Sequence, residues 1–378
     1  SEALAGEEHD RLERFMRALE RDDNLDRAVE SLPNTAAMRA RGTARQYLTR
    51  PELAVLLAYA KLDLNEAILA SDLPDDPLLE PELLRHFPST LQQRFESEIR
   101  RHRLRREIVA LQVVNSLVNR CGPAFVRSIA SRAGAEPAAI ARAFTVVRDA
   151  WRLREIWGEI EALDGALKAP AQVAMLVATQ RFLYRAVTWA LRRLPQPIDT
   201  IAATDALRDA VATLGDLPAS LVGEAESAAL GQRAAALEKL GAPPSLARRV
   251  AALETLAAAG ELMLSARAGN VGLEEATRLY FRLAERLGLA PLGAAADRLP
   301  REGQWPAQAA RSMQDELGKL QAELLASVLQ AGGSVEAWAD RRKLALERVD
   351  RLRDELAAAS SVDLPMLSVA LSELRSLI

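Results

Sequence analysis

Apolar residues recur at three- and four-residue spacing along almost the whole chain, and no segment alternates apolar and polar residues as a half-buried strand does. Ala, Leu, Glu and Arg, which favour helices, fill the intervals between proline and glycine breaks. The pattern predicts an all-α chain of packed helices and helical hairpins, in two subdomains and without a β-sheet. We expect helices at 7–32, 50–70, 78–86, 89–120, 123–133, 136–164, 171–193, 203–213, 219–240, 244–267, 272–287, 305–331, 335–359 and 363–377.

Proline-rich segments indicate the domain organisation. LPQPIDT, residues 194–200, is the expected boundary between a helical subdomain at 46–195 and a second at 196–378, with a helical lead-in segment at 1–45. In the last third, two apolar stripes have heptad-like spacing, and Gly332 and Gly333 can form the turn between them, which predicts an antiparallel hairpin. The stripes are Leu317, Leu320, Leu324 and Val328, and Ala345, Val349, Leu352 and Leu356.

The stretch LTRPELAVLLAYAKL, residues 48–62, marks the start of a helix heavily. Thr49 and Glu52 have the spacing of a capping box, and Leu48 and Leu53 have that of a hydrophobic staple. A proline lies in the first turn, where its missing N–H costs little. These signals predict where the helix begins and indicate an architectural role rather than chemistry.

Charge and cysteine content exclude several classes of function. The 378 residues carry a formal net charge of −3, which removes the usual reason to expect nucleic-acid or anionic-membrane binding. Cys121 is the only cysteine, so a disulfide or a cysteine metal cage within one chain is impossible, and a reducing cytoplasm fits best. Arg181 and Arg185 interrupt the most apolar window, 171–191, which therefore reads as a core helix and not a membrane span.

The first residues, SEALAGEEHD, have neither a basic region nor an apolar region of a signal peptide, and no initiator Met. We therefore expect the chain to be a piece of a longer polypeptide.

Motifs of common catalytic sites are missing from the sequence. It has no G-x-G fingerprint, no phosphate-binding loop and no G-x-S-x-G elbow, and His9, His86 and His102 form no zinc-binding pair. We therefore predict no catalytic, cofactor-binding or metal-binding residue in this chain.

The segment DDNLD has the D-D-x-x-D spacing with which helical prenyl-transfer enzymes hold magnesium. Its members are Asp22, Asp23 and Asp26, and hard carboxylate oxygens suit that cation. A second aspartate-rich motif is missing, and aromatic residues that could line a carbocation cavity are few. A solvated helix start or turn is the favoured interpretation.

Five arginines and His102 lie close together in RRHRLRRE, residues 100–107, and could form an anion site. However, Glu96 precedes Arg100 by four residues, and Glu98 precedes His102 by four. Arg103 likewise precedes Glu107 by four, the spacing of ion pairs on a helix surface. In an acidic chain, a solvated or interface face is the better interpretation.

Gln112, Asn115 and Asn119 form an amide stripe on a helix that is apolar nearly all round, which predicts that they are buried. Buried amides need partners, so the stripe is either a docking surface for another domain or a satisfied polar seam within this one. Arg181 and Arg185, one turn apart on another apolar helix, pose the same choice. Glu155 and Glu159 could pair with these arginines. We treat the amides and the two arginines as candidate interdomain contacts.

A series of longer motifs closely resembles the large bacterial NAD-specific glutamate dehydrogenases. They are LDRAVESLP (25–33), LTRPELAVLLAYAKL (48–62), SDLPDDPLL (71–79), HFP (86–88), HRLRREIVALQVVNSLVNRCGPAFV (102–126), WGEIEALD (157–164), TWALRR (188–193) and, more loosely, RLYFRLAERLGLAPL (278–292). The resemblance covers most of the chain and is strongest from about residue 20 to residue 195.

The resemblance implies that this is the helical region at the C-terminal end of such an enzyme, downstream of its catalytic part. The parent would catabolise glutamate in the cytoplasm as a homo-oligomer, converting L-glutamate, NAD and water to 2-oxoglutarate, ammonia and NADH. The family's substrate lysines, its aspartate and its nucleotide-binding fold would precede residue 1, so no cofactor is expected in this chain and the chain alone would be inactive. Its expected partner is the catalytic domain of the same polypeptide, with neither nucleic acid nor membrane. The alternatives are an independent helical adaptor and a magnesium-dependent prenyl-transfer enzyme.

Overall fold

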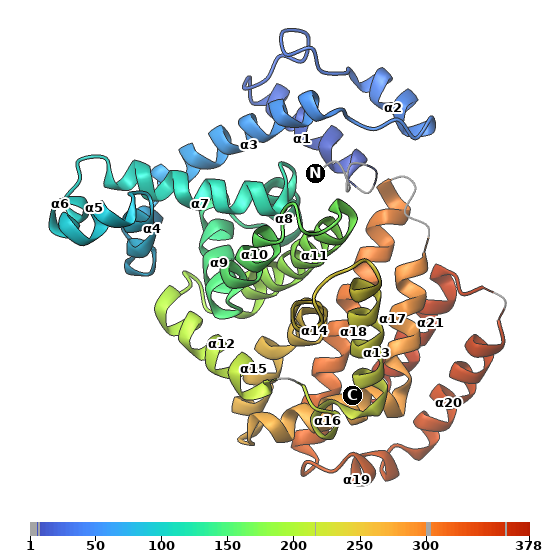
Figure 1. Cartoon of the computed structure of the whole chain (residues 1–378). Coiled ribbons are helices and arrows are strands. Elements are labelled where there is room, and N and C mark those ends of the chain that lie inside the picture. The colour runs from blue at the N-terminus through green and yellow to red at the C-terminus, as the bar shows by residue number, and fades with distance from the viewer. Residues whose placement is uncertain (1–5, 7, 216, 300–303, 360) are drawn as a thin grey trace. The chain divides into compact units, whose positions relative to one another are not determined.

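The computed structural model describes residues 6, 8–215, 217–299, 304–359 and 361–378. These residues form α-helices and two short 3₁₀ helices and contain no strand, which confirms the all-α prediction (Figure 1). Within these ranges, no helix combines the length and the apolar composition that crossing a membrane requires.

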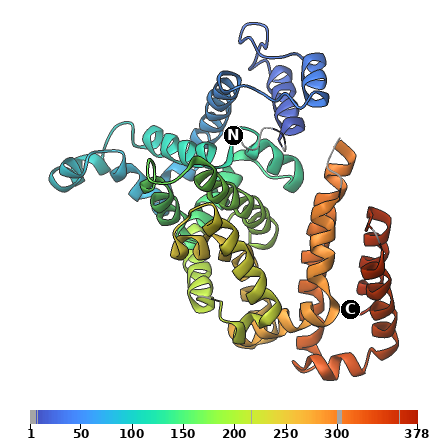
Figure 2. The same cartoon turned by 45° about the vertical axis from the view of Figure 1, so that its right-hand side comes forward.

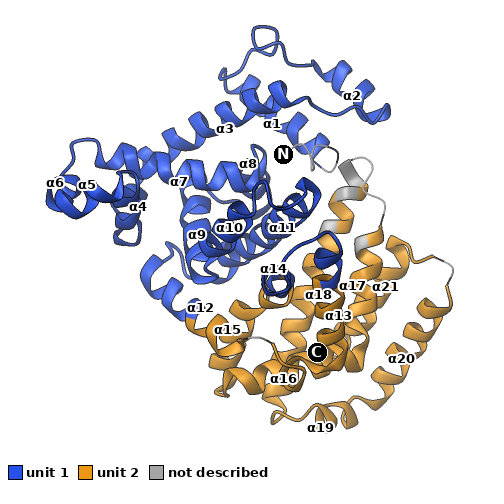
Figure 3. Ribbon diagram, in the orientation of Figure 1, with its two compact units in different colours: residues 1–208, 235–253 blue, residues 209–234, 254–378 orange. Residues whose placement is uncertain are grey.

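The chain divides into two compact units, coloured separately in Figure 3. Unit 1 comprises residues 1–208 and 235–253, and unit 2 comprises residues 209–234 and 254–378. The division of the sequence into 1–45, 46–195 and 196–378 stays a prediction.

Unit 1 begins with a long series of helices. They are α1 (His9–Arg21), α2 (Thr35–Thr43), α3 (Arg50–Leu69), the 3₁₀ helices η2 (Leu73–Asp75) and η3 (Pro77–Leu79), α4 (Glu80–Arg85), α5 (Ser89–Arg94), α6 (Glu96–Arg100), α7 (Arg105–Cys121), α8 (Phe125–Ala133), α9 (Pro137–Ala150), α10 (Leu153–Ala162) and α11 (Ala169–Arg193). Three further helices run from one unit into the other, α12 (Thr200–Leu214), α13 (Ala219–Lys239) and α14 (Pro244–Leu256).

The core of unit 1 lies among α3, α7, α9 and α11, of which α3 packs chiefly against α7 and α9 against α11. Helix α3 turns Leu53, Leu56 and Leu64 into this core, and α7 contributes Val113 and Leu117. Removing these aliphatic side chains from water supplies about 1.5–3 kcal/mol each. The apolar spacing of both helices thus decides which face each one buries.

The expected start of α3 is confirmed. The Glu52 carboxylate accepts hydrogen bonds from the Thr49 N–H at 2.7 Å and from the Thr49 hydroxyl at 2.8 Å. The two staple residues, Leu48 and Leu53, are both buried, and a proline lies in the first turn. Local sequence signals are therefore sufficient to place this helix.

Several long helices of the prediction are interrupted. The expected helix 7–32 ends at Arg21, and Asp23 and Ser31 adopt the left-handed conformation in the turns that follow. The expected helix 136–164 is broken at Arg152, whose φ of +51° separates α9 from α10. The segments 89–120, 244–267 and 335–359 are likewise divided, and α2 was not expected.

Unit 2 contains α15 (Ala259–Gly269), α16 (Leu273–Leu287), α17 (Leu289–Arg298), α18 (Gln304–Gln330), α19 (Val335–Asp340), α20 (Lys343–Ala358) and α21 (Leu364–Arg375). The sequence did not predict α17. Helix α18 packs against α15, α16, α17 and α21, whereas α20 packs against α19 and α21 (Figures 1 and 2). The two apolar stripes lie on α18 and α20, and the prediction that these helices pair with each other is wrong. Both pack against α21 instead. The turn at Gly332 and Gly333 is present, with φ values of +100° and +74°.

Candidate functional site

The amide residues of α7 lie at the edge of the core and not inside it. Gln112 and Asn115 are half-buried and Asn119 is exposed, so the expected burial of this stripe is wrong. The physical reason is that α7 directs a broad face, which includes Val109, into the core and leaves the amides on its outer side. Their role as interdomain contacts stays a prediction.

Gln112 is nevertheless held in place. Its Nε2 lies 3.0 Å from Nδ1 of His86, which follows α4. The ring of His86 meets the ring of Phe87 edge to face, with centroids 5.2 Å apart. The HFP segment, residues 86–88, therefore positions Gln112 on the outer side of α7.

Arg181 and Arg185 are exposed on α11, while Phe182 and Leu183 beside them are buried. This arrangement confirms that the apolar window forms a core helix, with its arginines on the outer side. The carboxylates considered as their partners contact other residues: Glu155 pairs with Arg152 at 2.8 Å, and Glu159 pairs with Arg249. The interdomain role of the two arginines stays a prediction.

DDNLD lies in the turn that follows α1. Asp22 pairs with Arg127 at 2.9 Å, and the Asp26 carboxylate accepts the backbone N–H groups of Ala28 and Val29. Asp23 adopts the left-handed conformation of a turn, with φ of +55°. Among the described residues, no group of three or more His, Cys, Asp or Glu side chains could hold a metal ion, at this motif or elsewhere. The magnesium interpretation of this motif thus has no support in the geometry.

Four of the five arginines of RRHRLRRE, namely Arg100, Arg101, Arg105 and Arg106, bind neighbouring parts of unit 1. Arg100 pairs with Glu96 at 2.6 Å, as predicted. A turn at 101–104 separates α6 from α7, and there the His102 Nδ1 accepts the N–H of Leu104. Arg106 donates to the carbonyl oxygens of Leu69 and Ser71, both at 2.9 Å. This basic segment is therefore occupied by contacts within the unit.

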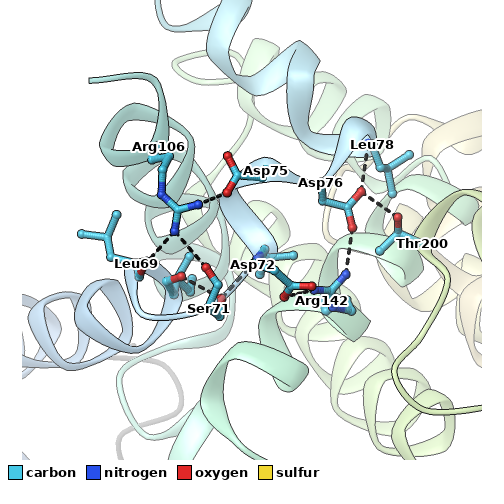
Figure 4. Close-up of polar contacts among 11 residues, drawn as sticks. Leu69, Ser71, Asp72, Asp75, Asp76, Leu78, Arg106, Arg142 and Thr200 are labelled. Carbon is cyan, nitrogen blue, oxygen red and sulfur yellow. Dashed lines mark hydrogen bonds and ion pairs between the residues drawn. The ribbon is translucent and has the colours of Figure 1, made fainter. Parts of the chain in front are cut away.

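Several polar contacts meet at the SDLPDDPLL segment, residues 71–79, which links α3 to α4 (Figure 4). The Asp76 carboxylate accepts hydrogen bonds from the Leu78 N–H at 3.0 Å and from the Thr200 hydroxyl at 2.7 Å. Arg142 of α9 binds Asp76 at 2.9 Å and also binds Asp72. One short segment is thereby joined to α9 and to the start of α12.

SDLPDDPLL was predicted from the sequence only as a break between helices, and its contacts were not predicted. On the opposite side, Arg106 of α7 pairs with Asp75 and holds the carbonyl groups at the end of α3. The available signal was two aspartates between two prolines, with a third aspartate just before them, a composition that fixes turns. The arrangement holds helix ends together.

The family model described as "Glutamate dehydrogenase, C-terminal" matches residues 45–376. The chain is 33% identical over 368 residues to the NAD-specific glutamate dehydrogenase of Halomonas elongata, 34% identical over 371 residues to that of Pseudomonas aeruginosa, and 30% identical over 358 residues to that of Mycobacterium tuberculosis.

These matches include 96%, 96% and 93% of this chain but 23%, 23% and 22% of the respective relatives. The chain therefore spans about a quarter of the length of the relatives that it matches.

Proposed function

The chain belongs to the glutamate dehydrogenase C-terminal family, and on this premise we propose that it is a non-catalytic helical segment of a large NAD-dependent glutamate dehydrogenase. The observation that carries the proposal is the coverage: 96% of this chain aligns with 23% of enzymes named NAD-specific glutamate dehydrogenase. The catalytic residues and the NAD site belong to other parts of that polypeptide, and this chain contributes architecture.

The parent enzyme converts L-glutamate, NAD and water to 2-oxoglutarate, ammonia and NADH in the cytoplasm. This chain supports the catalytic domain of the same polypeptide or the assembly of a homo-oligomer. The all-α fold supports such a role, because its described polar contacts hold helix ends together.

The outer face of α7 is the surface that we assign to this contact. Leu111 has 43% of its area exposed and lies beside the half-buried Gln112 and Asn115, with Asn119 one turn beyond. An interface with an apolar patch and amide groups that can pair is typical of contacts between domains of one chain. Arg181 and Arg185, exposed on α11, form a second candidate contact.

The test is to change Asn115 and Asn119 to Leu together in the whole enzyme. The expected result is altered oligomer mass or reduced glutamate-dependent NAD reduction, because the partner's polar groups lose their hydrogen bonds. Gln232→Leu, at an exposed position on α13, is the matched control and should leave both unchanged. If the double variant equals the wild type in mass and in activity, the α7 face is not the contact.

A further inference from the structure

Three arginines of unit 1 converge on one buried carboxylate. Arg85 comes from α4, Arg148 from α9 and Arg154 from α10, and all three contact Oε1 of Glu82. The distances to this oxygen are 3.1 Å from Arg85 and 2.9 Å from Arg148. The Glu82 side chain is only 4% exposed, so water screens this group of charges poorly.

Arg148 is fully buried and incompletely paired. Its Nε and Nη2 bind the two oxygens of Asp149 at 2.6 and 2.7 Å, and Nη2 also binds Glu82. Its Nη1 has no hydrogen-bond partner and is, among the described residues, the only buried terminal guanidinium nitrogen in that condition. Leaving a charged donor buried and unpaired costs folding free energy. Arg148 differs in this respect from an ordinary structural arginine, whose buried donors are paired.

Positive charge exceeds negative charge in this cluster. The three guanidinium groups face two carboxylates, those of Glu82 and Asp149, and Arg154 also lies 3.5 Å from Asp149. Burial lowers the pKa of Arg154 to about 10, and burial together with the charge of Arg148 lowers the pKa of Arg85. One further anion would relieve this repulsion.

Two of the three arginines reach solvent. The side chains of Arg85 and Arg154 are 49% and 32% exposed, respectively, whereas that of Arg148 is fully buried. Guanidinium groups bind carboxylate and phosphate through paired N–H donors that match the oxygen spacing. The available donors therefore favour an oxyanion over any other ligand class.

We propose that Arg85, Arg148 and Arg154 form an oxyanion-binding site, in which a phosphate or carboxylate group binds beside Arg85 and Arg154 and accepts a hydrogen bond from Nη1 of Arg148. The two outer side chains shift to admit the anion, while Glu82 and Asp149 keep the guanidinium groups oriented. This proposal is independent of the proposed function, because it rests only on residues of unit 1.

The test is a calorimetric titration of the 378-residue chain with inorganic phosphate and with acetate, at constant ionic strength set by chloride. Arg85→Gln and Arg154→Gln each remove one outer donor at a partly exposed position, so both variants should fold. Arg152→Gln is the matched control, since it removes the same charge two residues from Arg154, at a side chain that is 66% exposed and pairs with Glu155. Thermal midpoints establish that every variant is folded.

The expected result is saturable binding of at least one anion, with the Kd raised about tenfold or more in Arg85→Gln and in Arg154→Gln and unchanged in Arg152→Gln. A tetraglutamate peptide that binds more tightly than acetate identifies a protein carboxylate as the source, and a peptide that binds no better identifies a free anion. Lack of binding by the wild type, or equal binding by all variants, overturns the site.

Discussion

Glu52 holds the start of α3 through several hydrogen bonds. Its carboxylate accepts from Thr49 and from the Arg41 guanidinium, at 2.8 and 2.9 Å in the latter case. Burial alone would raise the pKa of Glu52, but these hydrogen bonds outweigh it and lower the pKa below its ordinary value. The contribution of Glu52 to stability is therefore present above the unfolded-state pKa of about 4.3 and is lost as the pH falls through the folded-state pKa.

Changing Glu52 to Gln should lower the free energy of unfolding at neutral pH by about 1–2 kcal/mol. The difference from the wild type should shrink as the pH falls below about 4, because the wild-type carboxylate is then protonated as well. Urea unfolding at a series of pH values measures this difference. Glu66→Gln, at an exposed position of the same helix, is the control and should have little effect. A difference that stays constant into the acid range contradicts the account.

Asp76 and Asp72 share the guanidinium of Arg142 but differ in burial. The Asp76 side chain is 6% exposed and that of Asp72 is 83% exposed. We expect Asp76→Ala to cost about 3 kcal/mol of unfolding free energy, because it leaves Arg142 without its buried partner. Asp72→Ala should cost less than about 1 kcal/mol. Equal costs in denaturant unfolding would show that burial does not govern this pair.

At the scale of elements, α21 is the helix that connects the last third of the chain. It buries Leu367, Leu371 and Leu374 and packs against both α18 and α20. Asp363 caps it by accepting the N–H of Met366 at 3.0 Å. The final helix is thus part of the core of unit 2 and not a peripheral end.

Leu374→Ala should lower the free energy of unfolding by about 2–5 kcal/mol, because it opens a cavity in a packed interface. Leu374 is 1% exposed, whereas Val369 on the same helix is 53% exposed. Val369→Ala is therefore the control, with an effect within about 0.5 kcal/mol. A small loss for Leu374→Ala in denaturant unfolding would favour the direct pairing of α18 and α20.

Helix content and many helix starts could be predicted from the sequence because apolar spacing and caps are local signals. The interruptions at 101–104, 151–152 and 341–342 contain neither Pro nor Gly, so no local signal identifies them. At 152, the arginine adopts a left-handed conformation that the surrounding packing stabilises.

The polar contacts were harder to predict than the helices. Asp76 binds Arg142 and Thr200, which are 66 and 124 residues away in the sequence. Local sequence patterns cannot predict contacts between residues so far apart. The amide stripe of α7 was expected to be buried because the helix is rich in apolar residues throughout. Which side of such a helix meets the core is decided by its neighbours, and these left Asn119 exposed.

At the scale of the whole molecule, the family match at 45–376 includes most of both compact units. The helices from α3 onward therefore belong to the family region. The relatives are about four times as long as the segment matched, which supports the proposal that catalysis belongs to other parts of the polypeptide.

The most direct measurement is immunoprecipitation from the source cells with an antibody against this chain, followed by sizing of the polypeptide and an assay of glutamate-dependent NAD reduction. The account predicts a polypeptide about four times the 41.2 kDa of this chain, with the activity in the precipitate. A polypeptide near 41.2 kDa without that activity would contradict the account and favour an independent helical adaptor.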